Sequence, residues 1–272
     1  MKRATSIPEF RALRAQLPEP VGFVPTMGYL HRGHAANVER CRKENASVVA
    51  SVFVNPTQFN DPGDLAAYPR DLEADARLLE RCGCDLLFVP EASEMYPDGF
   101  ATKMDAGPLA TVYEGAHRPG HFDGVCVIVA KLFHIVAPQR AYFGRKDAQQ
   151  LAVIRQLVRD LAFDTEIVPV ETVRDPDGLA LSSRNVRLSP TGRIHALGIS
   201  VGLMRARAAW REGERDPDSV AAIARDPGLD YDYCACVDPV SFGVPRSEGP
   251  AVVIVAATVD GVRLIDNIEL SA

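Results

Sequence analysis

The stretch between Val21 and Val54 constrains the fold most, because it reads as a strand, a helix and a second strand in succession. The first strand is predicted over Val21 to Thr26, the helix ends near Lys43, and the second strand covers Ser47 to Val54. The second strand is an almost unbroken apolar run, which is typical of a strand buried on both faces of a parallel sheet. Strand, helix and strand within about thirty-five residues form a βαβ unit, so an α/β domain is predicted.

A turn with two histidines joins the first strand to the helix. Its sequence, Pro25-Thr-Met-Gly-Tyr-Leu-His31-Arg-Gly-His34, lets Gly28 take a positive φ and lets Gly33 leave room for a ligand. If the helix begins just before His31, the two rings share one face of its first turn. Unpaired N–H groups and the helix dipole then face the turn, which predicts a phosphate site. Although H-x-G-H alone is more typical of an ordinary helix start, the preceding strand and turn favour the phosphate site.

Strands and helices continue to alternate after this unit. Strands are predicted over residues 85–89, 141–143 and 165–170, and helices over 4–17, 71–82, 124–136 and from Asp147 to about 161. The helix over 124–136 has an amphipathic pattern, whereas residues 91–124 are rich in glycine and proline and are predicted to be irregular. The alternation predicts a parallel sheet with helices on both faces.

The composition changes after about residue 185. Ser189-Pro190 starts a helix that is predicted to reach about Trp210. Its buried face is predicted to consist of Ile194, Leu197, Val201 and Met204. A short helix near 217–225, a strand over 231–237 and a hairpin of strands 251–259 and 262–265 follow. We therefore expect a parallel α/β domain over residues 1–173 and a smaller α+β domain over residues 174–272.

Polar side chains gather in the loops that follow predicted strands. Asn55 and Gln58 follow the second strand, and their amides can donate to and accept from hydroxyls or a carboxylate. The alternative is that these two side chains hold the loop together and bind no ligand. Arg118 lies in a glycine-containing loop and could hold a carboxylate or a phosphate through two hydrogen bonds. Isolated loop histidines such as His117 and His121 are more often not ligands.

Two further segments suit phosphate binding. Lys146 and Asp147 lie where a strand leads through a glycine into a helix, so that Lys146 supplies a point charge. Asp147 could cap that helix or help to place a cation. In the loop with Ser182, Ser183 and Arg184, adjacent hydroxyls beside an arginine suit the outer phosphates of a nucleotide, although this composition is common in loops.

Charge and composition exclude several classes of protein. The chain carries 30 basic and 36 acidic side chains, a formal net charge of −6, which argues against a general nucleic-acid or membrane-surface binder but not against ATP. No run of 18 apolar residues and no apolar segment after the basic start occur, so neither a membrane span nor a secretory signal is expected. The six cysteines lack the spacing of a zinc site, so no metal site made by protein side chains is expected. The simpler interpretation is that they are reduced thiols in a cytoplasmic protein.

Seven motifs in one order carry a resemblance to a known family. They are Pro25-Thr-Met-Gly-Tyr-Leu-His31-Arg-Gly-His34, Phe53-Val-Asn-Pro-Thr-Gln-Phe59, Tyr68-Pro-Arg70, Arg118-Pro-Gly-His-Phe122, Phe143-Gly-x-Lys-Asp-x-Gln-Gln150, Leu181-Ser-Ser-Arg-Asn185 and Arg263-Leu-Ile-Asp-Asn267. They span nearly the whole chain, which resembles the pantothenate synthetase (pantoate–β-alanine ligase) family. H-x-G-H alone is less specific, because other nucleotidyltransferase-like enzymes and some aminoacyl-tRNA synthetases share it.

The resemblance implies an ATP-dependent, Mg²⁺-requiring condensation of (R)-pantoate with β-alanine through a pantoyl-adenylate, with release of pyrophosphate and AMP. It also implies a Rossmann-like, nucleotidyltransferase-like N-terminal domain, a smaller C-terminal lid domain and a homodimer. The competing hypotheses are a nucleotidyltransferase of the same fold, which leaves the nucleotide on its product, and a catalytically inactive nucleotide-binding protein.

The resemblance also assigns roles to individual residues. His34 is implied to be the catalytic proton donor, with His31 beside it, and both would act with Lys146 on the charge that builds at phosphorus. The implied ATP contacts are Met27, Gly28, Tyr29, Leu30, His31, Arg32, Gly33, His34, Gly144, Arg145, Lys146, Asp147, Val173, Leu181, Ser182, Ser183 and Arg184. Gln58 and Gln150 are implied to bind pantoate, with Gln58 also facing β-alanine. The chemistry of Asn55 and Arg118 adds these two residues to the expected substrate site.

Two positions depart from the family pattern. Arg145 stands where an acidic residue is usual, and Ala148 stands where an aromatic residue is usual. Since Arg145 adds positive charge beside Lys146, we expect it to strengthen phosphate binding or to alter the placement of Mg²⁺. Neither residue is assigned to the chemistry, so activity is expected to survive both changes.

Overall fold

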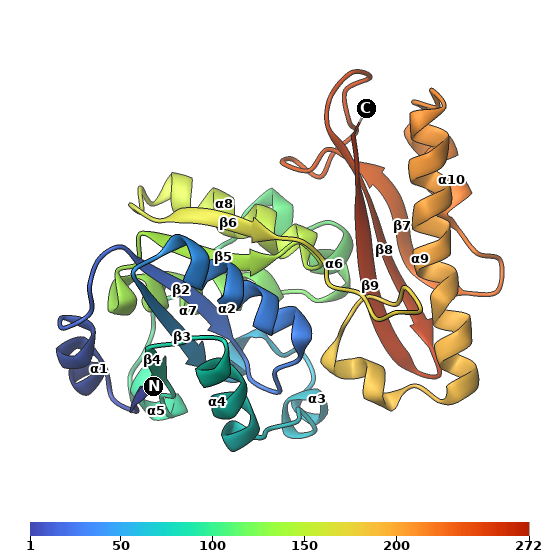
Figure 1. Cartoon of the computed structure of the whole chain (residues 1–272). Coiled ribbons are helices and arrows are strands. Elements are labelled where there is room, and N and C mark those ends of the chain that lie inside the picture. Colours follow the sequence, from blue (N-terminus) through green and yellow to red (C-terminus); the bar gives the residue numbers. More distant parts are fainter. Residues whose placement is uncertain (272) are drawn as a thin grey trace.

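The structure is a computed structural model that describes residues 1–271, and it has two parts that lie side by side (Figure 1). The larger part is built on a six-stranded sheet in which all neighbouring strands are parallel, as predicted. Its strands are β1 (Lys2–Ala4), β2 (Val21–Thr26), β3 (Ser47–Val52), β4 (Leu86–Phe88), β5 (Arg140–Gly144) and β6 (Glu166–Val170). Their spatial order is β1-β4-β3-β2-β5-β6, so the direction of winding reverses between β2 and β5.

Helices cover both faces of this sheet, which confirms the predicted arrangement. The helices α1 (Ile7–Arg14), α7 (His121–Val136) and α8 (Ala148–Asp160) share one apolar core with Phe23 of β2. The helices α2 (Arg32–Glu44) and α4 (Leu72–Arg81) share a second core with Val24 of β2. Successive side chains of β2 thus enter different cores, as the two-residue period of a strand requires. The connections hold short helices: α3 (Pro62–Ala66), α5 (Ala92–Met95), α6 (Tyr113–His117), η1 (Pro56–Gln58), η2 (Pro108–Ala110) and η3 (Ser183–Arg187).

Several predicted boundaries in this part are wrong. Residues 2–4 form the edge strand β1, and α1 begins only after Ser6, whose hydroxyl accepts the Glu9 N–H. Two of the three β1 residues are exposed, so no apolar run marks this edge strand in the sequence. The helix predicted to be amphipathic over 124–136 is α7, which begins at His121 and buries thirteen of its 16 residues. The region 91–124, predicted to be irregular, contains α5 and α6.

The smaller part is a three-stranded antiparallel sheet with two helices against it (Figure 1). Its strands β7 (Asp230–Val237), β8 (Ala251–Val259) and β9 (Val262–Leu270) lie in that order, and its helices are α9 (Pro190–Arg211) and α10 (Pro217–Ala224). The predicted hairpin turn is present, since Asp260 and Gly261 both have positive φ, and β9 runs to Leu270 rather than Ile265. The predicted α+β unit is confirmed.

The inward face of α9 differs from the predicted one. Of the four residues predicted to be buried, three are mostly exposed: Ile194 (68%), Val201 (53%) and Met204 (53%). The buried face instead carries Ala196, Ile199, Leu203, Ala206 and Trp210. Close packing selects this face, because a Cβ at Gly202 would lie only 1.9 Å from the Ala224 carbonyl oxygen. Both faces carry apolar residues at helical spacing, so periodicity alone could not choose between them.

The two parts share an apolar core. Val237, Val252 and Ile254 of the small sheet, with Phe242 after β7, belong to the same cluster as the side chains of α7. Alternate residues of the same strands, such as Val253, enter the core with α9. The small sheet is therefore packed on both faces. No helix within residues 1–271 is both long and apolar enough to cross a membrane.

Candidate active site

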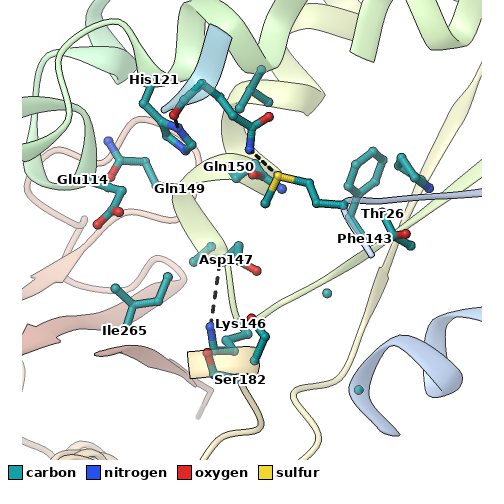
Figure 2. Close-up of a pocket in the computed structure, with 18 of the residues that line it drawn as sticks. Thr26, Glu114, His121, Phe143, Lys146, Asp147, Gln149, Gln150, Ser182 and Ile265 are labelled. Carbon is teal, nitrogen blue, oxygen red and sulfur yellow. Dashed lines mark hydrogen bonds and ion pairs between the residues drawn. The ribbon is translucent and has the colours of Figure 1, made fainter. Parts of the chain in front are cut away.

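A cavity of about 300 Å³ opens where the carboxyl ends of the parallel strands meet the small sheet. Thr26 at the end of β2 and Phe143 at the end of β5 line it, and these two strands flank the point where the winding direction reverses. Ligands of open α/β sheets bind at such a point. The small sheet supplies a further wall through Arg263, Ile265 and Asn267 (Ile265 is labelled in Figure 2).

Most of the residues predicted for the site line this cavity. Those in its wall are Met27, His31, Gly33, His34, Asn55, Gln58, Arg118, Gly144, Lys146, Asp147, Gln150, Val173, Leu181, Ser182, Ser183 and Arg184. Segments that are far apart in the sequence therefore meet at one place. The predicted residues that lie outside the wall are Gly28, Tyr29, Leu30, Arg32 and Arg145.

The turn after β2 is filled by a carboxylate of the protein itself. Gly28 takes a φ of +88°, as expected, and lets the chain turn past Asp75 of α4. The buried carboxylate of Asp75 accepts the N–H of Tyr29 at 2.9 Å and that of Leu30 at 2.7 Å. These two amides are therefore satisfied within the protein and are not available to a phosphate.

The two histidines cap the helix that follows. His31 is the N-cap of α2, and its Nδ1 accepts the N–H of Gly33 at 3.1 Å. The Nδ1 of His34 accepts the N–H of His31 at 3.2 Å, and the two ring centroids are 4.2 Å apart. Because both Nδ1 atoms accept, the neutral rings carry their protons on Nε2. The N–H groups of His31 and Gly33 at this helix start are therefore paired within the protein, contrary to the expected unpaired amides, and the two imidazole Nε2–H groups become donors for a ligand.

Both imidazoles are neutral in the folded protein. Burial, followed by the charge of Lys146, lowers the pKa of His31 to about 4. Burial also lowers the pKa of His34 to about 3, and His31 and Lys146 act in the same direction. A bound anion would oppose these effects, since it favours the charged form of a histidine.

Lys146 lies at the start of a helix whose first turn is open. Asp147 occupies the N-cap position of α8, and within the described chain no side chain accepts a capping hydrogen bond there. The Nζ of Lys146 lies 3.9 Å from Asp147 Oδ1, and Figure 2 shows Ser182 beside the lysine. A cation and a helix N-terminus thus face the same cavity, an arrangement that attracts phosphate.

The loop before α9 brings hydroxyl groups and a guanidinium to the same end of the cavity. Ser182 Oγ accepts the N–H of Arg184 at 3.2 Å, which fixes the start of η3. The Nη2 of Arg184 lies 3.2 Å from Asp64 Oδ2 of α3, and the two side chains are 39% and 35% exposed. An incoming phosphate would therefore compete with Asp64 for this guanidinium.

The amide of Asn55 is fully occupied by the protein. Its Nδ2 donates to Gln58 Oε1 at 3.0 Å and to the Gly124 carbonyl at 3.1 Å. Its Oδ1 accepts the hydroxyls of Tyr96 at 2.7 Å and Thr57 at 3.0 Å. Asn55 therefore holds the loop together, which is the alternative left open by the sequence, and its amide has no free atom for a substrate.

Gln58 and Gln150 keep more freedom than Asn55. The Nε2 of Gln58 lies 3.0 Å from the thioether sulfur of Met27, which is a weak acceptor that a ligand can replace. Gln150, on α8, lines the same cavity (Figure 2). Both side chains line one cavity, and their role in binding a substrate stays a prediction.

A buried carboxylate that the sequence did not single out joins two arginines. Glu114 accepts hydrogen bonds from Arg118 at 3.3 Å, from Arg263 at 2.8 Å and from the Tyr233 hydroxyl at 3.2 Å. Burial alone would raise the pKa of Glu114, but the charges of Arg263 and Arg118 outweigh it and leave the pKa below its ordinary value. Arg118 also donates to the main-chain oxygen of Gln58 at 3.2 Å. The spacing of Glu114 and Arg118, four residues apart, could have suggested their pairing, whereas the partner Arg263 is 149 residues away and leaves no local signal.

Arg145 lies outside the cavity wall and pairs with carboxylates of the protein. Its Nη1 forms an ion pair with Glu269 of β9, and its Nε lies 3.0 Å from Glu171 Oε1 without the alignment of a hydrogen bond. The expected effect of Arg145 on phosphate binding or on the placement of Mg²⁺ stays a prediction, although two carboxylates already pair with its guanidinium.

The side chains that most often bind metals are dispersed over the described chain. Within residues 1–271 no three His, Cys, Asp or Glu side chains form a group that could hold a metal ion by themselves. All six cysteines are free thiols, and Cys82 is the one that is not buried.

Comparison with known proteins gives one consistent result. A family model described as pantoate-beta-alanine ligase matches residues 2–269. A pantothenate synthetase of Thermus thermophilus is 54% identical over 270 residues, which cover 95% of this chain and 96% of that protein. One from Roseiflexus castenholzii is 46% identical and covers 100% of both chains.

Solved structures agree with these sequence matches. A crystal structure of pantothenate synthetase from Thermus thermophilus superposes with a TM-score of 0.90 at 50% identity, over 98% of this chain and 99% of that one. A pantoate-beta-alanine ligase of Francisella tularensis, complexed with beta-gamma ATP and beta-alanine, superposes with a TM-score of 0.80 at 34% identity, over 98% and 97% of the two chains.

Proposed function

Because the chain belongs to the pantoate-beta-alanine ligase family, we infer that its cavity joins pantoate to β-alanine with the consumption of ATP. The observation that carries this inference is the meeting of His31, His34, Lys146 and Arg184 in one cavity at the point where the sheet reverses its winding. The family match extends over both parts of the chain, so the small sheet belongs to the same enzyme.

The reaction proceeds in two displacements. The carboxylate of pantoate attacks the α-phosphorus of ATP, the bond to the β-phosphate oxygen breaks, and pyrophosphate leaves. The amine of β-alanine then attacks the acyl carbon of pantoyl-adenylate, AMP leaves, and the amine loses a proton. The small sheet forms part of the cavity wall, and we propose that this wall helps to keep water from the reactive anhydride between the two steps.

The phosphate end of the cavity stabilises charge in the first step. His31 and His34 donate neutral Nε2–H groups, and Lys146 adds a point charge to oxygens whose charge grows in the transition state. Because the pKa values of both rings lie far below neutral pH, His34 acts as a hydrogen-bond donor when the nucleotide arrives, rather than as an imidazolium. The proposed ATP contacts in the wall are Met27, His31, Gly33, His34, Gly144, Lys146, Asp147, Val173, Leu181, Ser182, Ser183 and Arg184.

The other end of the cavity receives the acid and the amine. Gln58 and Gln150 are proposed to bind the hydroxyl and carboxylate groups of pantoate, since amides can both donate and accept. Arg118 supplies positive charge there for a substrate carboxylate, with Glu114 behind it. Asn55 contributes by holding Gln58 in place.

Mg²⁺ fits this donor set as a companion of ATP. Such ions are bound through one or two carboxylates and substrate phosphates and keep several waters. Asp147 is the proposed carboxylate, since it lines the cavity beside Lys146 and its side chain is 48% exposed. When bound, the ion supplies charge neutralisation at the phosphates.

Three further properties complete the proposal. The first is a division into two domains, residues 1–173 and 174–272, each with its own sheet. The second is a homodimer, which the family resemblance supports and a mass measurement by light scattering would test. The free thiols support a reducing, cytoplasmic location.

Pantoate-dependent exchange of pyrophosphate into ATP tests the function. The purified protein with ATP, pantoate and Mg²⁺ should catalyse exchange, and addition of β-alanine should release free AMP. A nucleotide left on the product would identify a nucleotidyltransferase instead, and ATP binding without turnover would identify an inactive protein.

His34→Ala tests the role of the imidazole in the same assay. We expect the exchange rate to fall about 10²- to 10³-fold, as for other transition-state donors, while the Kd for ATP changes much less. Equal losses in rate and binding would contradict a transition-state role for His34.

A further inference from the structure

The turn that carries Lys146 is held by a side chain of the small sheet. The Nδ2 of Asn267, on β9, donates to the carbonyl oxygen of Arg145 at 2.9 Å and to that of Lys146 at 2.7 Å. Asn267 is 6% exposed, so these hydrogen bonds are formed away from bulk water. One side-chain amide therefore donates to two successive carbonyl groups at Lys146, the proposed phosphate-binding cation.

The orientation of Asn267 is itself fixed. Its N–H donates to Asp266 Oδ1 at 2.8 Å, and the buried Asp266 carboxylate is held by Arg174 through two hydrogen bonds of 2.6 and 2.9 Å. Arg174 lies in the segment that connects the two parts of the chain. The bidentate ion pair of Arg174 with Asp266 thus fixes the carboxylate that holds Asn267, and such a pair allows little variation in geometry.

The main chain of this turn is also held by β6, since the Arg145 N–H donates to the Val170 carbonyl oxygen at 2.8 Å, whereas no hydrogen bond among the described residues holds the charged end of the Lys146 side chain. The carboxylate nearest to its Nζ is that of Asp147, at 3.9 Å, which is beyond hydrogen-bond distance. A lysine side chain is a flexible stem with a point charge at its end, so its position follows the main chain that carries it. A misplacement of about 1 Å in a catalytic arrangement can cost about 10²-fold in rate.

We propose that Asn267 is a positioning residue that sets Lys146 in place for the first displacement and makes that placement depend on the small sheet. The ion pair between Arg145 and Glu269 holds the same turn from its outer side. The inference rests on the proposed function of Lys146. It gives Asn267 a role at the phosphate end of the cavity, although this residue lies on the small sheet.

A double-variant comparison tests the proposal. In the wild-type background, Asn267→Ala should lower kcat for pantoate-dependent exchange by about tenfold to a hundredfold with a smaller change in KM for pantoate. In a Lys146→Ala background the same change should alter the rate less than about twofold, because the group that it positions is gone. Asn267→Asp, which keeps the shape but loses the amide donor, should lose at least as much as Asn267→Ala.

Thr165→Val is the matched control. It removes another buried hydrogen bond from a side chain to a carbonyl, that of Thr165 to Pro138 at 2.9 Å, at the opposite end of the sheet. We expect its kcat to stay within about twofold of the wild type. If Asn267→Ala does not fold, Asn267→Ser, with a shorter donor, replaces it in the same comparison.

Two outcomes would overturn the proposal. One is a folded Asn267 variant with wild-type kcat, and the other is an Asn267 effect that is equally large with and without Lys146. Either result with an active wild type refutes only the positioning role. A wild type without exchange activity refutes the proposed function, and the positioning role with it.

Discussion

Three histidines, the half-buried His31 and His34 and the buried His121, stay neutral in the folded protein at pH values where a free imidazole is largely protonated. Burial is the main cause for His31, His34 and His121, whose pKa values fall to about 4, 3 and 4. Each ring is held by the protein: the Nδ1 atoms of the first two accept main-chain N–H groups, and Nδ1 of His121 lies 2.8 Å from the Gln58 oxygen. The cavity therefore offers neutral hydrogen-bond donors rather than extra cations before ATP arrives.

These histidines make stability depend on pH in a defined direction. Between about pH 6.5 and 4 the unfolded chain binds protons on the histidines and the folded protein does not, so stability falls as the pH is lowered through this window. The melting temperature of the wild type should therefore drop more between pH 6.5 and 4.5 than that of His34→Asn, which lacks one of the three groups. An equal drop in melting temperature for the wild type and His34→Asn would show that protonation of His34 is not linked to folding. The remaining carboxylates titrate in both proteins and cancel in the comparison.

The ion pair between Arg184 and Asp64 leads to a prediction about nucleotide affinity. If phosphate and Asp64 compete for the guanidinium, Asp64→Asn should lower the KM for ATP by about two- to fivefold, since exposed pairs are worth about 0.2–1 kcal/mol. Initial rates of exchange at several ATP concentrations give the value. Glu73→Gln, which breaks the exposed pair with Arg3 outside the cavity, is the control and should leave the KM unchanged. An unchanged or higher KM for Asp64→Asn would argue against competition.

At the scale of elements, the strands of the parallel sheet could be predicted well and the helix faces less well. The strand β2 has the predicted limits, because a buried parallel strand is a short apolar run that ends at a turn. The face of α9 could not be predicted, because its inward side is chosen by the close approach of α10 at Gly202 and not by apolar spacing. Likewise the filling of the turn before α2 by Asp75 depends on a residue 45 positions away, which local patterns do not reveal. The capping of α2 by His31 and His34 is local, but histidine is not among the residues that usually cap a helix.

The corrected face of α9 is testable by stability measurements. Leu203→Ala should lower the free energy of unfolding by about 2–5 kcal/mol, because it leaves a cavity in a fully buried site. Met204→Ala, one residue away and 53% exposed, should change it by no more than about 0.5 kcal/mol. Urea titrations of both variants give the free energies of unfolding. Similar losses for the two would contradict the buried face described here and support the one predicted from the sequence.

At the scale of the whole molecule, a shared apolar core joins the two parts in spite of their separate sheets. The core that contains α7 also contains Val237, Phe242, Val252 and Ile254 of the small part. Buried polar contacts add to it at both ends of the cavity, through Glu114 with Arg263 and through Asn267 with the Lys146 turn. The motifs predicted which segments meet in the cavity, but they could not reveal these pairings, since each partner acts across the junction of the two parts.

A single tryptophan makes it possible to test whether the two parts unfold together. Trp210 is buried in the α9 core of the small part, so its fluorescence reports on that part, whereas far-ultraviolet circular dichroism reports on the whole chain. We expect the two signals to change at the same urea concentration in the wild type, as in a two-state transition. Phe242→Ala removes apolar contact at the junction and should separate the two midpoints or lower both. Separate transitions in the wild type would show that the two parts fold independently.

The carboxylate of Asp75 gives the enzyme a built-in acceptor for the N–H groups of Tyr29 and Leu30. These two N–H groups have an acceptor before any nucleotide binds, so the turn is ordered in the empty enzyme. In deuterium-exchange experiments these two amide hydrogens should therefore be protected to the same degree in the empty and the nucleotide-loaded enzyme, while the peptides that cover Ser182 to Arg184 gain protection.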